Sequence, residues 1–208
     1  MSVPTLFLYM KTIRSLIHIG SALFLSACAT SPTRDQFAGT KTTLLSSAET
    51  YINTPSNFQF PSMVAGFERA QITKFDPQGQ DVGIGFNHLA HKIAMTVYVY
   101  PIPQGMPEDP IRAHFGTCKY EILKRHAGAQ PISEQSVKIS VGGSVRSGKR
   151  ATFSYSQVFA HQHQAVLSDV YLFRNGQRFI KYRVTYPIGA QSEAKADIHN
   201  FMSQLLWP

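Results

Sequence analysis

Cysteine and charge are both scarce in this chain of 208 residues. Two cysteines are too few for a disulfide framework or a zinc-finger type of metal site. Charged residues make up 15% of the chain, against about 25% in typical globular proteins, yet the 43% of hydrophobic residues excludes wholesale disorder. The length fits one domain of ordinary size with at most an appendage, which excludes a multidomain enzyme.

The chain also lacks a hydrophobic run long enough to cross a membrane. The apolar segment 15–25, which follows the basic residues Lys11 and Arg14, is shorter than the roughly 20 residues that a transmembrane helix needs. It has the charge and length of a signal peptide instead and ends in Leu25-Ser26-Ala27-Cys28. This ending resembles the lipobox of bacterial lipoproteins.

The lipobox resemblance implies removal of residues 1–27 and acylation of Cys28, with acyl chains such as palmitate anchoring the protein to a membrane. Removal of Lys11 and Arg14 would lower the net charge from +8 to +6. Ala29 after the cysteine implies, by the sorting pattern of such lipoproteins, the outer membrane and a domain that faces the periplasm. A signal peptide that is cut elsewhere and a transmembrane anchor are the alternatives.

The expected organisation has three parts. Residues 1–9 place apolar side chains ahead of the basic residues, so Met10 is a better start for a signal peptide than Met1. Residues 28–57 are predicted to be the anchored cysteine and a flexible tether, because 29–47 are rich in Ser, Thr, Gly and Ala. Residues 58–208 are predicted to form one domain.

Within that domain, hydrophobic periodicity predicts strands and two helices. Strands are expected at 67–75, 82–88, 93–100, 134–141, 149–160, 165–174 and 177–186, and helices at about 110–127 and 192–206. Asn175-Gly176 is a strong hairpin signal, and hairpins are antiparallel. The predicted fold is therefore α+β, with an antiparallel sheet of about six to seven strands flanked by helices in an α/β/α sandwich.

Three segments, 98–101, 171–176 and 179–187, resemble a group of uncharacterised bacterial proteins with a PsbP-like or LpqN-like α/β/α arrangement. The resemblance would extend over residues 58–208. Its motifs are structural and imply no catalytic signature and no cofactor.

Histidine pairs are the candidate metal ligands. His161 and His163 would point the same way from an extended strand and could bind zinc or copper. His88 and His91 form the other close pair. No carboxylate or thiol lies near either pair in sequence, so exposed loop histidines are the competing interpretation.

Two further groups of residues lie on the predicted hairpin. Asp169 shares a face with apolar residues, so it needs a donor, and a turn centred on Asn175-Gly176 places Tyr182 opposite it. A structural hydrogen bond and a pocket-lining role are both open. Arg174, Lys181 and Arg183 lie on the other face, which predicts a basic surface for anionic lipid headgroups or envelope polymers.

No complete catalytic motif is present. The segment 143–149 matches the start of a phosphate-binding loop, but Arg150 stands where Ser or Thr is required. The sequence thus predicts a lipid-anchored, non-enzymatic binding or accessory domain of the cell envelope, with an envelope protein or anionic polymer as partner and no nucleic acid. The alternatives are a histidine-dependent envelope hydrolase or metalloenzyme, and a small-ligand carrier with an apolar pocket beside Asp169.

Overall fold

The computed structural model describes residues 41–43 and 49–208. The lipobox, Cys28 and Met10 lie outside these described residues. The elements are β1 (Lys41–Thr43), β2 (Tyr51–Asn53), β3 (Phe58–Phe60), β4 (Met63–Val64), β5 (Phe67–Lys74), β6 (Val82–His88), β7 (Ile93–Pro101), α1 (Pro110–Arg125), β8 (Gln130–Val141), β9 (Ser144–Phe159), β10 (Gln162–Asn175), β11 (Arg178–Pro187) and α2 (Gln191–Gln204).

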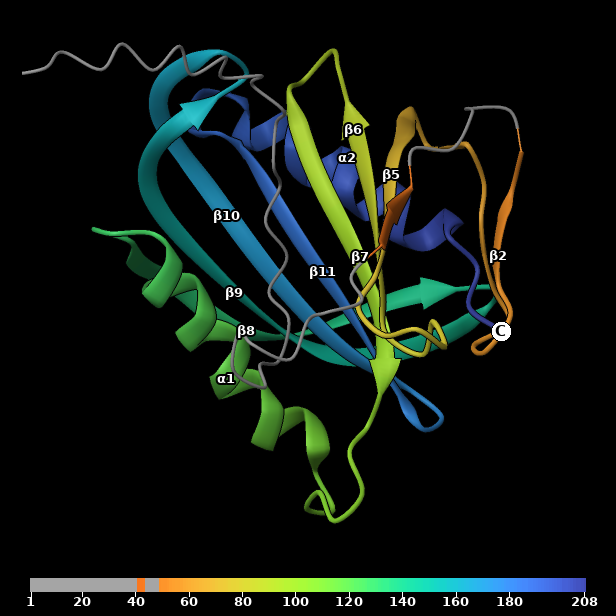
Figure 1. The fold of residues 1–208 in the computed structure, drawn as a ribbon. Coiled ribbons are helices and arrows are strands. Elements are labelled where there is room, and N and C mark those ends of the chain that lie inside the picture. Colours follow the sequence, from red (N-terminus) through yellow and green to blue (C-terminus); the bar gives the residue numbers. More distant parts are fainter. Residues whose placement is uncertain (1–40, 44–48) are drawn as a thin grey trace, which may run out of the picture.

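An antiparallel sheet forms the centre of the molecule (Figure 1). Its strand order is β1-β5-β6-β7-β11-β10-β9-β8, and β4 pairs with β5 as the ninth strand, while β2 and β3 form a separate small sheet. The α+β class is confirmed. The expected six to seven strands were too few, because β1 and β4 are short strands without a clear alternating pattern.

The start of the folded region also differs from the prediction. The domain was expected from residue 58, yet β1 pairs with β5 and β2 pairs with β3. Asn53 is buried, and its side-chain amide donates to the carbonyl of Gly79 at 3.0 Å. The part of the expected tether from residue 49 to residue 57 therefore belongs to the fold.

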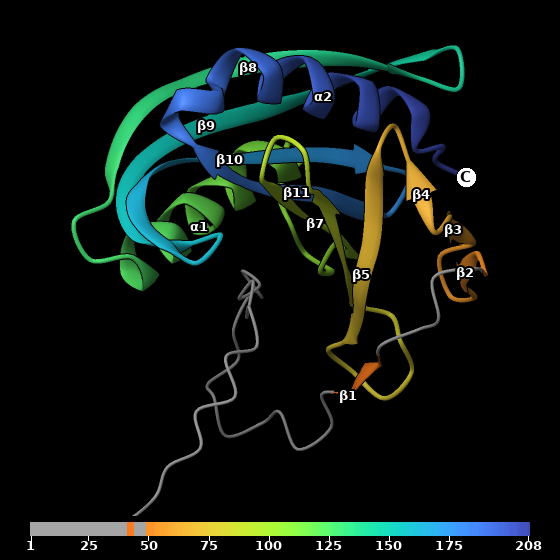
Figure 2. The ribbon, with the colours of Figure 1, turned by 90° about the horizontal axis from the view of Figure 1, so that it is seen from above.

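The two helices lie on opposite faces of the main sheet (Figure 2), as the sandwich prediction required. Helix α1 begins after Asp109, whose carboxylate accepts from the Arg112 N–H at 3.0 Å, and Pro110 occupies the first turn. It buries Phe115, Cys118 and Ile122. Helix α2 buries Ala194, Ile198, Phe201 and Met202. Among the described residues, neither helix is both long and apolar enough to cross a membrane.

We call the two sides of the sheet the α1 face and the α2 face. Strand β7 shows the alternation between them, because Tyr98 and Tyr100 belong to the α1 core whereas Val97 and Val99 belong to the α2 core. The α2 core is the larger and contains many aromatic residues. Phe201 of α2 meets the rings of Phe67 and Phe86 edge-on at centroid distances of 5.0 and 4.9 Å.

The β10–β11 hairpin has a different register from the one expected. Asn175 pairs with Arg178, so the turn residues are Gly176 and Gln177, and Asp169 lies opposite Val184 rather than Tyr182. Only Gly176 of the two turn residues has a positive φ, 56°, which is the pattern of a type II′ turn with glycine first. Asp169 nevertheless projects from the predicted face, since Tyr171, Phe173 and Ile180 all belong to the α2 core.

Candidate functional site

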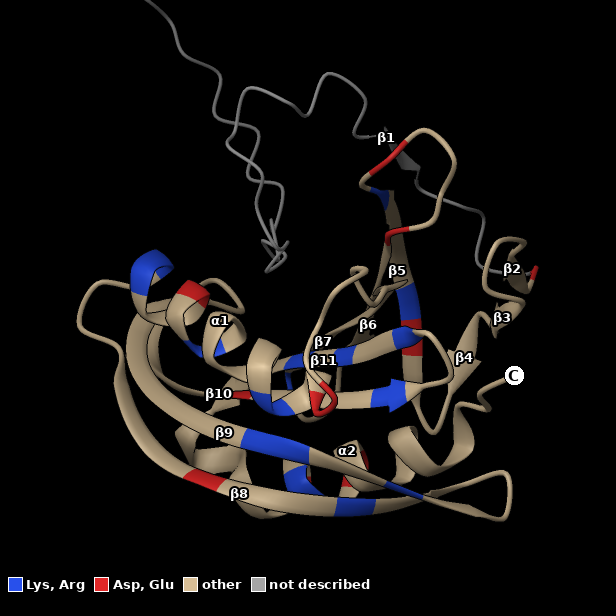
Figure 3. Cartoon of the chain, turned by 90° about the horizontal axis from the view of Figure 1, so that it is seen from below, with Lys and Arg blue, Asp and Glu red and all other residues tan. Residues whose placement is uncertain are grey.

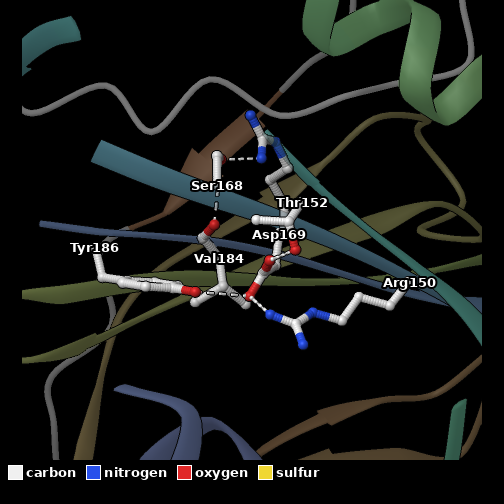
Figure 4. A network of polar contacts seen from close by, with 7 residues as sticks. Arg150, Thr152, Ser168, Asp169, Val184 and Tyr186 are labelled. Carbon is white, nitrogen blue, oxygen red and sulfur yellow. Dashed lines mark hydrogen bonds and ion pairs between the residues drawn. The ribbon is translucent and has the colours of Figure 1, made fainter. Parts of the chain in front are cut away.

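Asp169 is the centre of a buried polar network on the α2 face (Figure 4). Its side chain is 0% exposed. Arg150 Nη2 and the Tyr186 hydroxyl donate to Oδ2 at 2.9 and 3.1 Å, and the Thr152 hydroxyl donates to Oδ1 at 2.6 Å. Both carboxylate oxygens thus have donors within the protein, which identifies a structural ion pair and not a pocket-lining acid.

Tyr182 is not the partner of Asp169. Its hydroxyl accepts a hydrogen bond from Trp207 Nε1 at 3.0 Å. Burial raises the pKa of Tyr182 and of Tyr186, and for Tyr186 the nearby Asp169 charge raises it further. Both phenols therefore remain neutral. The small-ligand pocket expected beside Asp169 and Tyr182 is replaced by this packed network.

The predicted basic surface is also different from expectation. Arg174 is exposed and bonds the carbonyl of Gly176, but Lys181 is 1% and Arg183 is 8% exposed. Both lie on the α1 face. Lys and Arg are instead spread over α1, β8 and β9 as well as β11 (Figure 3).

The two buried cations have specific neighbours. The Lys181 ammonium lies 4.4 Å from the Tyr98 ring centroid and 5.4 Å from that of Tyr100. Arg183 donates to the hydroxyls of Ser168 and Tyr155. These contacts fix both side chains beneath the α1 core, so Lys181 and Arg183 cannot contact a lipid headgroup in this structure.

Two histidines near these cations are shifted toward the neutral form. Burial and, second, the Lys181 charge lower the pKa of His114 to about 4. Burial, then Arg183 and Arg125, lower the pKa of His126 to about 4. Burial is thus the main reason that both imidazoles stay neutral, and the neighbouring cations give the α1 face an electropositive character that adds to this effect.

His161 and His163 do not form the expected pair. Ala160 and His161 make the two-residue turn between β9 and β10, with φ of 48° and 65°. His161 is therefore not in an extended strand, so the condition for parallel side chains fails. His163 is exposed on β10 opposite Val158. The predicted metal site at His161 and His163 assumed that both residues lie in one extended strand, and this assumption is wrong.

A pocket of about 260 Å³ lies where the β6–β7 turn approaches the β9–β10 turn. Its lining residues are Ala70, Gln71, Gly85, Asn87, His88, Leu89, Lys92, Ile93, Ala94, Phe159, Ala160 and His161. The lining is mostly apolar and contains no acidic residue, whereas Lys92 and His161 add basic groups. The sequence did not predict this pocket.

Small residues explain why the pocket is hollow. Gly85 and Ala94 lie on neighbouring strands, and Ala70 lies at a bulge of β5 where the register shifts between Arg69 and Gln71. A Cβ on Gly85 would be 3.0 Å from Gln71 Cγ. A larger side chain at any of the three small positions would occupy the space.

A second group lies beside the same β6–β7 turn, and we call it the His–Asp cluster: His88, His91 and Asp197. His91 Nδ1 is 2.6 Å from Asp197 Oδ2, and the His88 and His91 rings stack at 4.9 Å. One potential ligand atom from each residue lies within 4.8 Å of the others. Asp197 comes from α2, 106 residues after His91, so sequence spacing gave no signal for it.

Comparisons with known proteins add little to this site. The sequence matches no protein-family model and no curated protein. A structure of PsbP from the cyanobacterium Synechocystis is similar with a TM-score of 0.43 and 12% identity, over 86% of this chain and 96% of that one. This similarity is consistent with the PsbP-like arrangement that the sequence resemblance implied.

Two other solved structures have comparable scores. A protein of unknown function from Pseudomonas aeruginosa has a TM-score of 0.42 and 8% identity, over 56% of this chain and 73% of that one. The Ran-binding protein Mog1p of Saccharomyces cerevisiae has a TM-score of 0.38 and 10% identity, over 80% and 92%. With TM-scores below 0.5, these similarities carry no functional argument.

Proposed function

We propose that this protein is a lipid-anchored envelope lipoprotein whose folded domain binds an apolar ligand without chemical conversion. The pocket between the β6–β7 and β9–β10 turns is the observation that carries the binding proposal. Ligand sites are concave and mostly apolar, with a few polar groups that fix orientation. The small-ligand carrier is thus the favoured form of a binding domain.

The pocket restricts the ligand chemistry. The volume of about 260 Å³ is slightly below that of typical ligand pockets, which begin at about 300 Å³. One short apolar chain or one ring would therefore fill it. Lys92 and His161 among the lining residues favour an anionic group near the mouth. A fatty-acid-like molecule, with a carboxylate at one end, has both properties.

Binding of the fluorescent fatty acid cis-parinaric acid tests this proposal. Ala70 is partly exposed, so Ala70→Phe should fill the pocket without disturbing the core. We expect the variant to weaken binding by at least about tenfold, about 1.4 kcal/mol. Ala113→Phe on the exposed side of α1 is the matched control and should bind as the unaltered chain does. Equal affinity of all three proteins would refute the pocket.

The anchoring proposal is supported by Leu25-Ser26-Ala27-Cys28 behind a basic and apolar leader. It includes the expected outer-membrane location and an anionic envelope molecule as partner. Labelled palmitate should be incorporated into the chain in a bacterial host and lost in Cys28→Ser. The other cysteine supplies the control, because Cys118→Ser should retain the label. Label retained in Cys28→Ser would contradict the lipobox prediction.

A further inference from the structure

We infer that the His–Asp cluster is a binding site for one divalent transition-metal ion with the preferences of zinc. The inference goes beyond the proposed ligand pocket and does not depend on it. Two imidazoles and one carboxylate form a donor set that zinc uses in proteins. The three side chains come from the end of β6, the β6–β7 turn and α2, so a bound ion would connect the hairpin to the helix.

The distances require only small movements. Zinc bonds of about 2.1 Å place ligand atoms about 3.4 Å apart in a tetrahedral site. His91 Nδ1 and Asp197 Oδ2 are at 2.6 Å and would separate slightly, while atoms up to 4.8 Å apart would approach. The His91 side chain is 40% exposed, so its ring has room to rotate out of the stack with His88.

His88 is held in place on several sides. Phe67 contacts its ring edge-on at 5.0 Å, and a Cβ on Gly66 would lie 3.0 Å from Nε2. The His91 backbone N–H points to His88 Nδ1 at 3.3 Å. Nδ1 therefore accepts a hydrogen bond in the absence of a metal, and a metal ion bound at this nitrogen would replace the His91 N–H as the partner of its lone pair.

Access and a further oxygen ligand are also present. Asp197 is 20% exposed, so the cluster can be reached from solvent. Glu193 lies one helical turn before Asp197 on α2 and lines, with His91, a second hollow on the surface. Three protein ligands leave a coordination position for water or for Glu193.

Zinc binding to the full chain in detergent tests the inference. We expect calorimetry to show one zinc ion per chain, and zinc to raise the melting temperature because it binds only the folded state. Asp197→Asn and His91→Gln should each lower the zinc affinity by at least about tenfold. His163→Ala removes an exposed histidine outside both the cluster and the pocket; it is the control and should bind zinc as the unaltered chain does.

A second measurement covers the fold of the variants. The His91–Asp197 pair is partly exposed and contributes little, about 0–1 kcal/mol, so Asp197→Asn should melt like the unaltered chain in EDTA. Cobalt should replace zinc and give visible absorption bands that change in His88→Gln. The site would be refuted by absent stoichiometric binding, or by a zinc affinity that is unchanged in both Asp197→Asn and His91→Gln.

Discussion

On the α2 face the buried Asp169 meets three donors from neighbouring strands, whereas on the α1 face the buried Lys181 and Arg183 meet aromatic rings and hydroxyls. The α2 face otherwise consists of large apolar side chains that fill the space beneath α2. The α1 face combines buried cations with small residues such as Gly85 and Ala94, and it contains the pocket.

The difference suggests that the α2 face mainly stabilises the fold and that the α1 face contains the binding site. The network around Asp169 stabilises the fold, because both of its carboxylate oxygens accept hydrogen bonds from neighbouring strands. On the α1 face, by contrast, the burial of Lys181 and Arg183 costs desolvation free energy and the pocket leaves the packing incomplete. Such departures from a well-packed apolar core are typical of functional sites. We therefore expect substitutions on the α2 face to affect folding most, and substitutions near the pocket to affect binding most.

The largest expected effect is that of Asp169→Ala. It leaves Arg150 partly buried without its carboxylate, and breaking a buried pair costs about 3–5 kcal/mol. Ser168→Ala, one residue away but on the α1 face, removes hydroxyl contacts with Arg183 and Thr185 and should cost about 1 kcal/mol. Urea unfolding of both variants gives the two values, and equal costs would contradict the contrast between the faces.

The next largest effects on stability are expected from replacing two glycines by alanine, one on β9 and one in α1, and the two changes should have opposite signs. A Cβ on Gly148 would lie 2.4 Å from Phe173 Cδ1 and 2.5 Å from the Leu172 carbonyl oxygen, so Gly148→Ala should destabilise by about 1–3 kcal/mol. Gly116 in α1 has nothing within 4 Å of its Cβ position, and Gly116→Ala should stabilise the helix by about 0.5–1 kcal/mol. Thermal unfolding measures both changes. Destabilisation by Gly116→Ala would show that the Cβ position of residue 116 is in contact with other atoms, contrary to this structure.

The sequence located the two helices and the long strands, but β8 and β9 begin four and five residues before their predicted starts at 134 and 149. The first half of β8 is exposed, so apolar periodicity does not mark where it begins. Helix α1 begins at Pro110 as the proline and the preceding acids indicated. The hairpin register was wrong by the placement of one turn residue: Asn175 ends β10, and Gly176 takes the first turn position. The two turn types share glycine, so the dipeptide alone cannot separate them.

The candidate site was less predictable, because it depends on contacts between distant segments. Alternation placed Lys181 and Arg183 on the correct face, but it could not show that this face is covered. The same limit applies to the His–Asp cluster, where His88 and His91 were visible as a pair and Asp197 was not. Hydrophobic patterns report which residues share a face and say little about what lies against it.

The smallest expected effect concerns pH and distinguishes the α1 face. His114 and His126 have pKa values that are lowered from 6.5 to about 4 in the folded chain. As the pH falls from 6.5 to 4, the unfolded chain therefore takes up these protons first, and the folded state should lose stability. Asp81 opposes this. Burial raises the pKa of Asp81 from 3.8 to about 6, although the nearby Lys181 charge partly offsets this rise. The folded chain therefore takes up this proton before the unfolded chain does, and it gains stability as the pH falls through 6.

Because two groups act against one, the net change should be a modest loss of stability between neutral pH and about pH 4. Asp81→Asn removes the opposing group and should make the loss steeper, whereas His114→Gln should make it shallower. Urea midpoints across the window, each compared with the unaltered chain, measure both changes. If His114→Gln leaves the dependence of the urea midpoint on pH unchanged, the surroundings of Lys181 on the α1 face are more hydrated than their burial implies. The electropositive character of that face would then be limited to Arg183 and His126.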